Sequence, residues 1–124
     1  MSFIASTEAP TFNLHGASFT GLASPSRGAT ETAVWIVTLD SGTPATPHQL
    51  TREEIFVGLE GHATAKIGDQ SFEVTPGSAL VVPPHTMFTI TNSGATPFKA
   101  VAVLPVGGQA VIAGQPAFTP PWAA

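Results

Sequence analysis

The sequence predicts an all-β domain in which two small sheets close around an internal pocket. Twelve Gly and twelve Pro are spread along the 124 residues, and so many breakers leave no room for a long helix. Between them lie short segments rich in Val, Ile, Phe and Thr. Short strands at regular spacing, separated by turn residues, are typical of β-sandwiches and barrels. A chain of this length is expected to form one domain, residues 1–124, with its own core.

Each expected strand is bounded by turn residues. Residues 31–39 (ETAVWIVTL) are apolar on both faces in their centre, which predicts a strand packed on two sides. A Gly-Asp pair predicts the hairpin turn between strands at 63–67 and 70–74. We expect an extended arm over 1–10 and an extended tail over 110–124, where consecutive prolines oppose a helix. The expected strands are 12–14, 17–22, 31–39, 48–50, 54–59, 63–67, 70–74, 79–82, 87–91 and 98–104.

Composition excludes several classes of protein. The formal net charge is -4, and four Lys and Arg are too few for a basic patch that binds nucleic-acid phosphates. No apolar run approaches the roughly 18 residues of a membrane span, and the N-terminus does not read as a signal peptide. The absence of cysteine removes disulfides, thiolate metal sites and a cysteine nucleophile. We therefore expect a cytoplasmic protein without nucleic-acid or membrane partners.

Two stretches combine turn residues and candidate ligands at fixed spacings. The first runs Gly42, five residues, His48, one residue, Leu50, three residues, Glu54, six residues, Gly61. The second runs Gly77, five residues, Pro83, then His85, Phe88 and Asn92. Together these spacings resemble the two signature motifs of the cupin superfamily, G-x5-H-x-H-x3–4-E-x6-G and G-x5-P-x-G-x2-H-x3-N. The resemblance covers roughly residues 42–92 and implies a small double-stranded β-helix, or jelly-roll barrel.

Strand alternation indicates which side chains face the barrel interior. Alternate residues of a strand share a face, so positions 48 and 50 are expected to point inward together. The same argument pairs Glu54 with Phe56. We predict that the inward apolar side chains line a substrate pocket, and the alternative is that they are plain core packing. The predicted pocket residues are Leu50, Phe56, Phe88, Ile90 and Trp35.

The resemblance also implies a metal site, from which this sequence departs. In a typical metal-binding cupin, His, His, Glu and His at positions 48, 50, 54 and 88 would converge on one divalent ion. Here Leu50 and Phe88 replace two histidines, so that His48 and Glu54 remain. Catalytic metals usually keep three protein ligands. We expect a weakly held divalent ion, Zn, Fe, Mn or Ni, whose shell is completed by water or substrate.

The other polar candidates are expected to lie outside the site. His85 occupies the family's glycine position near the barrel mouth, which favours a surface-turn histidine. Gln49 has the opposite strand parity to its neighbours and should point away from the pocket. His62 is expected on the outer face, and Glu53 is expected to point into solvent. The direction of His15 is undetermined.

Three functions are compatible with a pocket that contains His48 and Glu54. The pair could bind a metal for oxygenase, isomerase or lyase chemistry, as the resemblance implies. Without a metal, burial would raise the pKa of Glu54, and the pair could catalyse an isomerisation, cyclisation or elimination by acid–base chemistry. The pocket could also bind a small molecule without transforming it. The structural alternative is that the two side chains hydrogen-bond to each other or to a trapped water.

The tail contains a stiff apolar segment, Phe118–Trp122 (FTPPW). Prolines reduce the entropy that the segment loses when it becomes ordered, so we expect Trp122 to dock on the protein. It could cap its own barrel or cross to a second subunit. The resemblance implies pairing through sheet edges or terminal strands, and we predict a homodimer.

Overall fold

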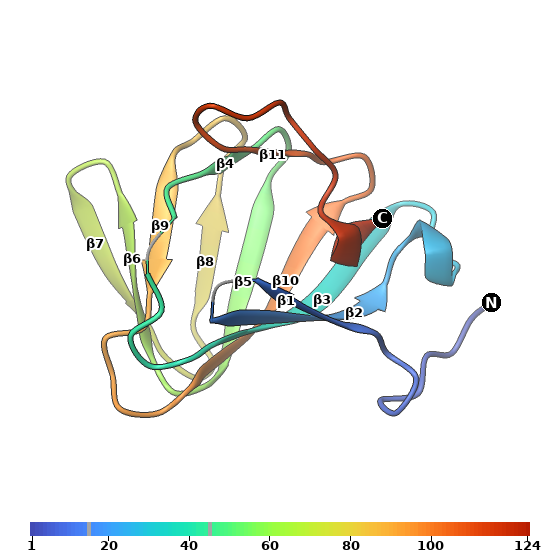
Figure 1. The fold of residues 1–124 in the computed structure, drawn as a ribbon, viewed down its shortest axis with the longest axis horizontal. Coiled ribbons are helices and arrows are strands. Elements are labelled where there is room, and N and C mark those ends of the chain that lie inside the picture. The colour runs from blue at the N-terminus through green and yellow to red at the C-terminus, as the bar shows by residue number, and fades with distance from the viewer. Residues whose placement is uncertain (15, 45) are drawn as a thin grey trace.

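The computed structural model describes residues 1–14, 16–44 and 46–124, so His15 and Ala45 lie outside the described part. Eleven strands form three sheets around one interior (Figure 1). Their bounds are β1 Thr11–Leu14, β2 Ala17–Ala23, β3 Thr32–Leu39, β4 Gln49–Leu50, β5 Glu54–Glu60, β6 Ala63–Ile67, β7 Gln70–Val74, β8 Ala79–Val82, β9 Phe88–Thr91, β10 Phe98–Pro105 and β11 Ala110–Val111. The helices described are two 3-10 turns, Pro25–Arg27 (η1) and Pro121–Ala123 (η2), and no described helix is long and apolar enough to cross a membrane.

The barrel is built from one large sheet and two small ones. The large sheet has the order β1-β2-β3-β10-β5-β8, and the small sheets are β7-β6-β9 and β11-β4. In Figure 1 the three-stranded sheet stands at one side of the large sheet, and β4 with β11 closes the top. The expectation of two small sheets is therefore corrected. The strands at the N-terminus pair in sequence onto the free edge of β3, which widens one sheet to six strands.

Strict alternation places the core on the inner face of the large sheet. Along β3 the buried residues are Ala33, Trp35, Val37 and Leu39, and along β10 they are Phe98, Ala100, Ala102 and Leu104. The alanines of β10 leave room for the large side chains of the neighbouring strand. The outer residues of β3, including Val34 and Ile36, are half-buried. We expected β3 to be packed on both faces. In the single chain its inner face is fully packed, whereas its outer face is only partly covered.

Asn92, the last residue of the second motif, joins two loops. Its side-chain amide donates to the Leu39 carbonyl at 3.0 Å and to the Thr96 carbonyl at 2.8 Å, and its oxygen accepts from the Gly94 N–H at 2.9 Å. The residue is 2% exposed, so these bonds satisfy a buried amide. The motif asparagine therefore has a structural role in holding the loops below the barrel.

The C-terminal tail folds back on its own barrel. Ala110 pairs with Leu50 and also bridges to Phe118, so the chain crosses the top of the interior and returns. The Trp122 ring then stacks on Phe19, with centroids 3.6 Å apart and planes 4° from parallel. The tail, expected to be extended throughout, ends in η2, because the fixed φ of Pro121 suits the first turn of a helix. The expected extended arm over 1–10 likewise contains one turn, in which Glu8 and Ala9 bond back to Ala5.

Candidate functional site

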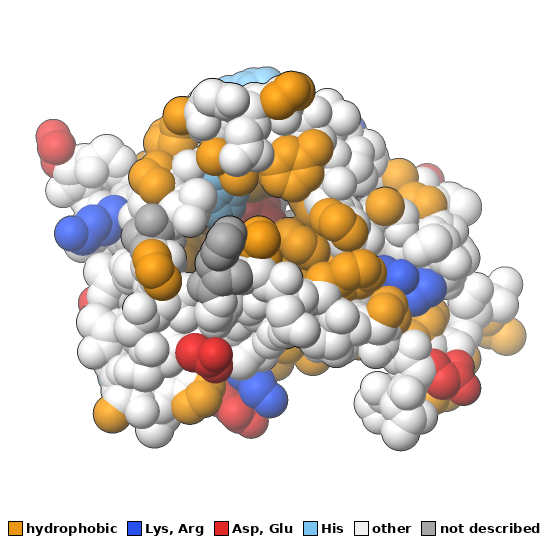
Figure 2. Space-filling view, in the orientation of Figure 1, with side chains coloured by type: hydrophobic (Ala, Val, Ile, Leu, Met, Phe, Trp, Pro, Cys, Tyr) orange, Lys and Arg blue, Asp and Glu red, His pale blue; other side chains and the backbone are white. Residues whose placement is uncertain are grey.

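The barrel contains a wide cavity of about 890 Å³. Every Phe and Trp of the chain except Phe3 and Phe72 lines it. Figure 2 shows the mouth of this cavity as a hollow rimmed by hydrophobic side chains, with a histidine and an acidic side chain visible inside. The structure places all five predicted pocket residues in the cavity wall: Leu50, Phe56, Phe88, Ile90 and Trp35.

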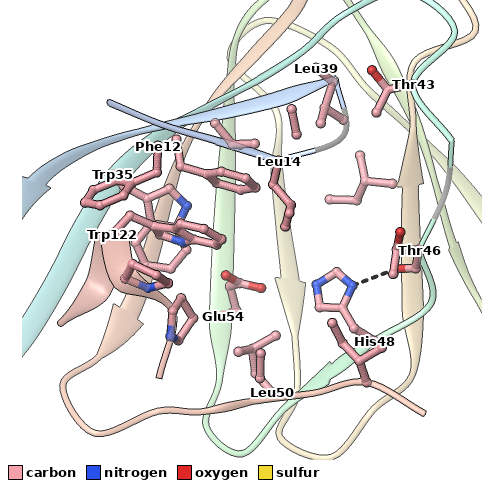
Figure 3. Close-up of a pocket in the computed structure, with 18 of the residues that line it drawn as sticks. Phe12, Leu14, Trp35, Leu39, Thr43, Thr46, His48, Leu50, Glu54 and Trp122 are labelled. Carbon is pink, nitrogen blue, oxygen red and sulfur yellow. Dashed lines mark hydrogen bonds between the residues drawn. The ribbon is translucent and has the colours of Figure 1, made fainter. Parts of the chain in front are cut away.

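Glu54 begins β5, in register with Val82 of β8, and its side chain points into the cavity (Figure 3). The residue is 3% exposed, and its Oε1 is buried without a hydrogen-bond partner in the described part of the chain. Burial disfavours the charged form and raises the pKa of Glu54 from 4.5 to about 8. At neutral pH the carboxyl group is therefore mainly protonated, and it can donate a proton to a bound molecule.

His48 lies on the opposite wall, where an isolated backbone bridge pairs it with Phe88. Its Nδ1 lies 2.9 Å from the Thr46 carbonyl oxygen, and since a carbonyl only accepts, Nδ1 carries the hydrogen. Nε2 of the neutral ring then has a free lone pair, and Figure 3 shows it facing the cavity. Burial lowers the pKa of His48, while the bond to the Thr46 carbonyl acts in the opposite direction. The site thus contains a neutral imidazole that can accept a proton.

The two polar side chains share the cavity without bonding to each other. The hydrogen bond of the His48 ring goes to Thr46, and none joins His48 and Glu54 among the described residues. Of the structural alternative, the direct hydrogen bond is therefore not found between these two side chains, and the trapped water stays a prediction. In Figure 3 the Glu54 carboxyl group points into the space between Trp122 and His48. A molecule bound in this space would contact the acid and the base together.

The donor set does not fit a resident catalytic metal. Leu50 and Phe88, at two of the ligand positions implied by the resemblance, are 3% and 2% exposed and belong to the apolar core. Within the described ranges no group of three or more His, Cys, Asp and Glu side chains is placed to hold an ion. His48 and Glu54 supply two donors where catalytic sites usually have three.

The remaining polar candidates lie where the sequence indicated. His85 and His62 are exposed, as is Glu53, and none of these lines the cavity. His85 has a φ of 57°, and its N–H donates to the Leu50 carbonyl at 2.8 Å, which makes it a turn residue at the barrel end. Gln49 is absent from the cavity wall. His15 lies outside the described residues.

Sequence reasoning missed the parts of the cavity wall that come from the two ends of the chain. The hairpin of β1 and β2 contributes Phe12 and Phe19, and the C-terminal segment contributes Phe118 and Trp122. The apolar segment at 118–122 was a signal that the tail docks, but nothing local showed where. The common strand parity of Phe12 and Leu14, which both line the cavity, was a second signal.

Comparisons with known proteins establish the family. The sequence model of the Cupin domain matches residues 35–104, and the chain belongs to the cupin family. The uncharacterized protein MJ1618 of Methanocaldococcus jannaschii is 39% identical over 49 residues, a match that spans 40% of this chain and 39% of that protein.

Two solved structures show the same fold. The polyketide cyclase RemF of Streptomyces resistomycificus superposes with a TM-score of 0.80 at 16% identity, over 94% of this chain and 87% of that one. KdgF from Halomonas sp. superposes with a TM-score of 0.72 at 20% identity, over 84% and 94% of the two chains. The double-stranded β-helix expected from the motifs is thus confirmed.

Proposed function

We propose that this cupin is an enzyme that moves a proton within a small, uncharged organic substrate. Glu54 serves as the general acid and Nε2 of His48 as the general base. The observation that carries the proposal is the placement of both groups in one apolar cavity, without a hydrogen bond between them. General acids and bases with pKa values near the working pH are the most effective.

The proton balance of such a reaction is simple. Nε2 of His48 takes a proton from a carbon next to a carbonyl group, while Glu54 gives its proton to the carbonyl oxygen, and an enol forms. Where the substrate carries a carbon–carbon double bond next to that carbon, the enol is a dienol. It returns its hydroxyl proton to the Glu54 carboxylate, and the imidazolium gives its proton to the far carbon of the dienol, so that the double bond moves next to the carbonyl group. Both residues regain their starting states. The cationic His48 and anionic Glu54 that exist between these steps stabilise each other in a medium of low polarity.

The same proton transfers support isomerisation or ring closure. An enol carbon formed in this way can also attack a second carbonyl carbon of the same molecule and close a ring. The enol hydroxyl proton then returns to the Glu54 carboxylate, and the imidazolium gives its proton to the oxygen of the attacked carbonyl. RemF, described as a polyketide cyclase, has this fold, so the barrel shape accommodates a ring-forming reaction. The cavity of about 890 Å³ is large enough for a substrate that folds on itself.

Solvent exchange on a simple ketone tests the proposal. The probe is 2-tetralone, a neutral ketone with acidic carbon-bound protons beside its carbonyl, and exchange in deuterium oxide is followed by proton NMR. We expect the protein to accelerate exchange, and Glu54→Gln and His48→Gln each to lower that rate about 100-fold. Glu53→Gln, which changes the exposed neighbour, is the matched control and should exchange like the wild type. Unchanged exchange in Glu54→Gln would exclude its role as the acid.

A metal-free binding protein is the second candidate function. It is favoured by the lining of the cavity, which is apolar apart from a few polar groups, as in many small-molecule sites. Binding of 2-tetralone without any exchange would identify this function. The weakly held Zn, Fe, Mn or Ni ion and the cytoplasmic location stay predictions from the sequence.

We also infer a homodimer that forms through the outer face of the large sheet. Two rows of residues cross this face: Ile36, Val101 and Val57 in one, and Val34, Val103 and Ile55 in the other. Both rows are uncharged and half-buried, and Val81 beside them is 52% exposed. A contiguous apolar face of this kind is typical of protein interfaces. A two-fold axis would bring the same rows of a second copy onto it.

A further inference from the structure

Aromatic side chains gather at one end of the cavity around Trp122. Its ring stacks on Phe19 at a centroid distance of 3.6 Å and lies 6.4 Å from Phe12 and 6.5 Å from Trp35, both tilted against it. All four rings line the cavity, although they come from strands near the N-terminus and from the C-terminal turn. This end is therefore assembled by segments far apart in the sequence. Its aromatic rings are available to contact a bound molecule.

A second aromatic group lies at the other end around Phe88. The Phe88 ring is 5.9 Å from Phe56, in an edge-to-face arrangement, and 4.5 Å from the His48 imidazole. Glu54 lies between the two groups, and its carboxyl group faces the space between Trp122 and His48 (Figure 3). A molecule that fills the cavity from end to end must pass the acid and the base.

The charge of the wall limits the charge of the ligand. None of the four Lys and Arg side chains, all of which are described, lines the cavity. A carboxylate or phosphate placed there would lose its hydration without gaining a cationic partner, which is costly. The ligand must therefore be uncharged where it is enclosed, and sugar acids and phosphate esters are disfavoured.

We propose that the substrate is an uncharged, planar molecule of two or more fused aromatic rings, with a hydroxyl or carbonyl oxygen at the edge that meets Glu54 and His48. The orientation of that edge toward Glu54 and His48 rests on the proposed function, whereas the binding of the rings does not. The aromatic group around Trp122 holds the rings, since aromatic pairs gain stability from stacked and edge-to-face contacts beyond their area alone. A single ring would leave most of the cavity of about 890 Å³ unfilled, which favours a larger ligand.

Affinity measurements on matched probes test the ligand class. Dissociation constants of the full chain are measured by calorimetry and by quenching of tryptophan fluorescence, because both tryptophans line the cavity. We expect 2-naphthol to bind about tenfold more tightly than its saturated analogue, decahydro-2-naphthol. It should bind at least about tenfold more tightly than 2-naphthoate, which carries a charge at neutral pH. The three-ring 2-hydroxyanthracene should bind more tightly than 2-naphthol.

A pair of variants assigns the preference to the aromatic wall. Phe12→Leu, at a half-buried position in the cavity wall, should weaken 2-naphthol binding several-fold and leave decahydro-2-naphthol unchanged. Phe72→Leu is the matched control, because Phe72 is exposed on β7 and does not line the cavity. A purely structural effect of Phe12→Leu would weaken the binding of both probes equally. That result would overturn the role of Phe12 in recognising aromatic rings.

The outcomes separate this inference from the proposed function. Equal binding of 2-naphthol and its saturated analogue, or tight binding of 2-naphthoate, would overturn the ligand class even if 2-tetralone exchange is accelerated. Ring preference without any exchange would leave the ligand class standing and remove the acid–base function. The affinities are therefore also measured in Glu54→Gln, where we expect the ring preference to persist after loss of exchange.

Discussion

His48 and Phe88 are joined by a pair of backbone hydrogen bonds. The His48 N–H donates to the Phe88 carbonyl at 3.2 Å, and the Phe88 N–H donates to the His48 carbonyl at 3.0 Å. Their ring centroids lie 4.5 Å apart. Phe88 occupies a position where the family motif has a histidine, and it thus lies directly beside His48, which keeps its motif histidine. Its apolar ring shields the imidazole from water, which favours the neutral form that can act as a base.

Restoring the missing histidines should complete a tight metal site around His48 and Glu54. We expect the wild type to be purified with well under one divalent ion per chain, and Leu50→His combined with Phe88→His to approach one. Three or four donors suffice for tight binding, whereas two do not. Plasma mass spectrometry on untagged protein measures the metal content per chain. A chelator should leave the rate of 2-tetralone exchange by the wild type unchanged. Near one ion per wild-type chain, lost in His48→Ala and Glu54→Ala, would instead establish metal chemistry.

Glu54 should make the folded protein less stable as the pH rises. Its pKa is about 8 when folded and near 4.5 when unfolded, so between these values the folded state holds a proton that the unfolded state has released. Stability is then lost with rising pH, by up to about 1.4 kcal/mol per pH unit. The lowered pKa of His48 makes stability rise with pH, but this effect occurs at pH values below 6.5, the ordinary pKa of histidine. The window that isolates Glu54 therefore runs from 6.5 to about 8.

Denaturant unfolding at several pH values across this window gives the slope. Glu54→Gln should abolish the loss of stability with pH and be more stable than the wild type at the alkaline end. Glu53→Gln, at an exposed position, should keep the wild-type slope. Parallel profiles for the wild type and Glu54→Gln would show that the carboxyl group ionises normally in the fold.

The strand pattern of the barrel could be predicted from the sequence because it is local. Alternation placed Glu54 and Phe56 on one face of a strand, and turn residues marked most strand ends. The pairing of β1 and β2 onto β3 could not be predicted, since sheet order depends on contacts between distant segments. The spacing of His48 and Glu54 likewise indicated a common site, and both line the cavity.

The rest of the cavity wall depends on where the chain ends dock. Phe19 and Trp122 are 103 positions apart in the sequence, yet their rings are stacked. No periodicity connects such residues, so the sequence was compatible with a tail that docks on its own barrel or on a second subunit. The lack of a bond between His48 and Glu54 was also beyond prediction, because it depends on how far apart the opposite walls of the cavity place the two side chains.

Ser24 should anchor the C-terminal turn that closes the cavity. Its hydroxyl donates to the Ala124 carbonyl at 2.7 Å, and the residue is fully buried. Ser24→Ala removes this bond and leaves a carbonyl less well satisfied, which should lower the free energy of unfolding by about 1–2 kcal/mol. Ser26 donates to the same carbonyl at 2.7 Å from an exposed position, so Ser26→Ala should have a smaller effect. Urea unfolding of both variants measures the two losses in the free energy of unfolding. Equal losses would contradict the role of burial.

The outer face of the large sheet should be the dimer interface. Val101 lies at its centre, paired with Ile36 on one side and Val57 on the other. Val101→Lys places a charge that would have to be buried without a partner in the dimer, whereas in the monomer a lysine can extend into water. We expect twice the chain mass for the wild type in sedimentation and a folded monomer for Val101→Lys. Gln70→Lys adds the same charge on exposed β7 and should remain dimeric. A monomeric wild type, or a dimer that Val101→Lys leaves intact, would place the interface elsewhere or remove it.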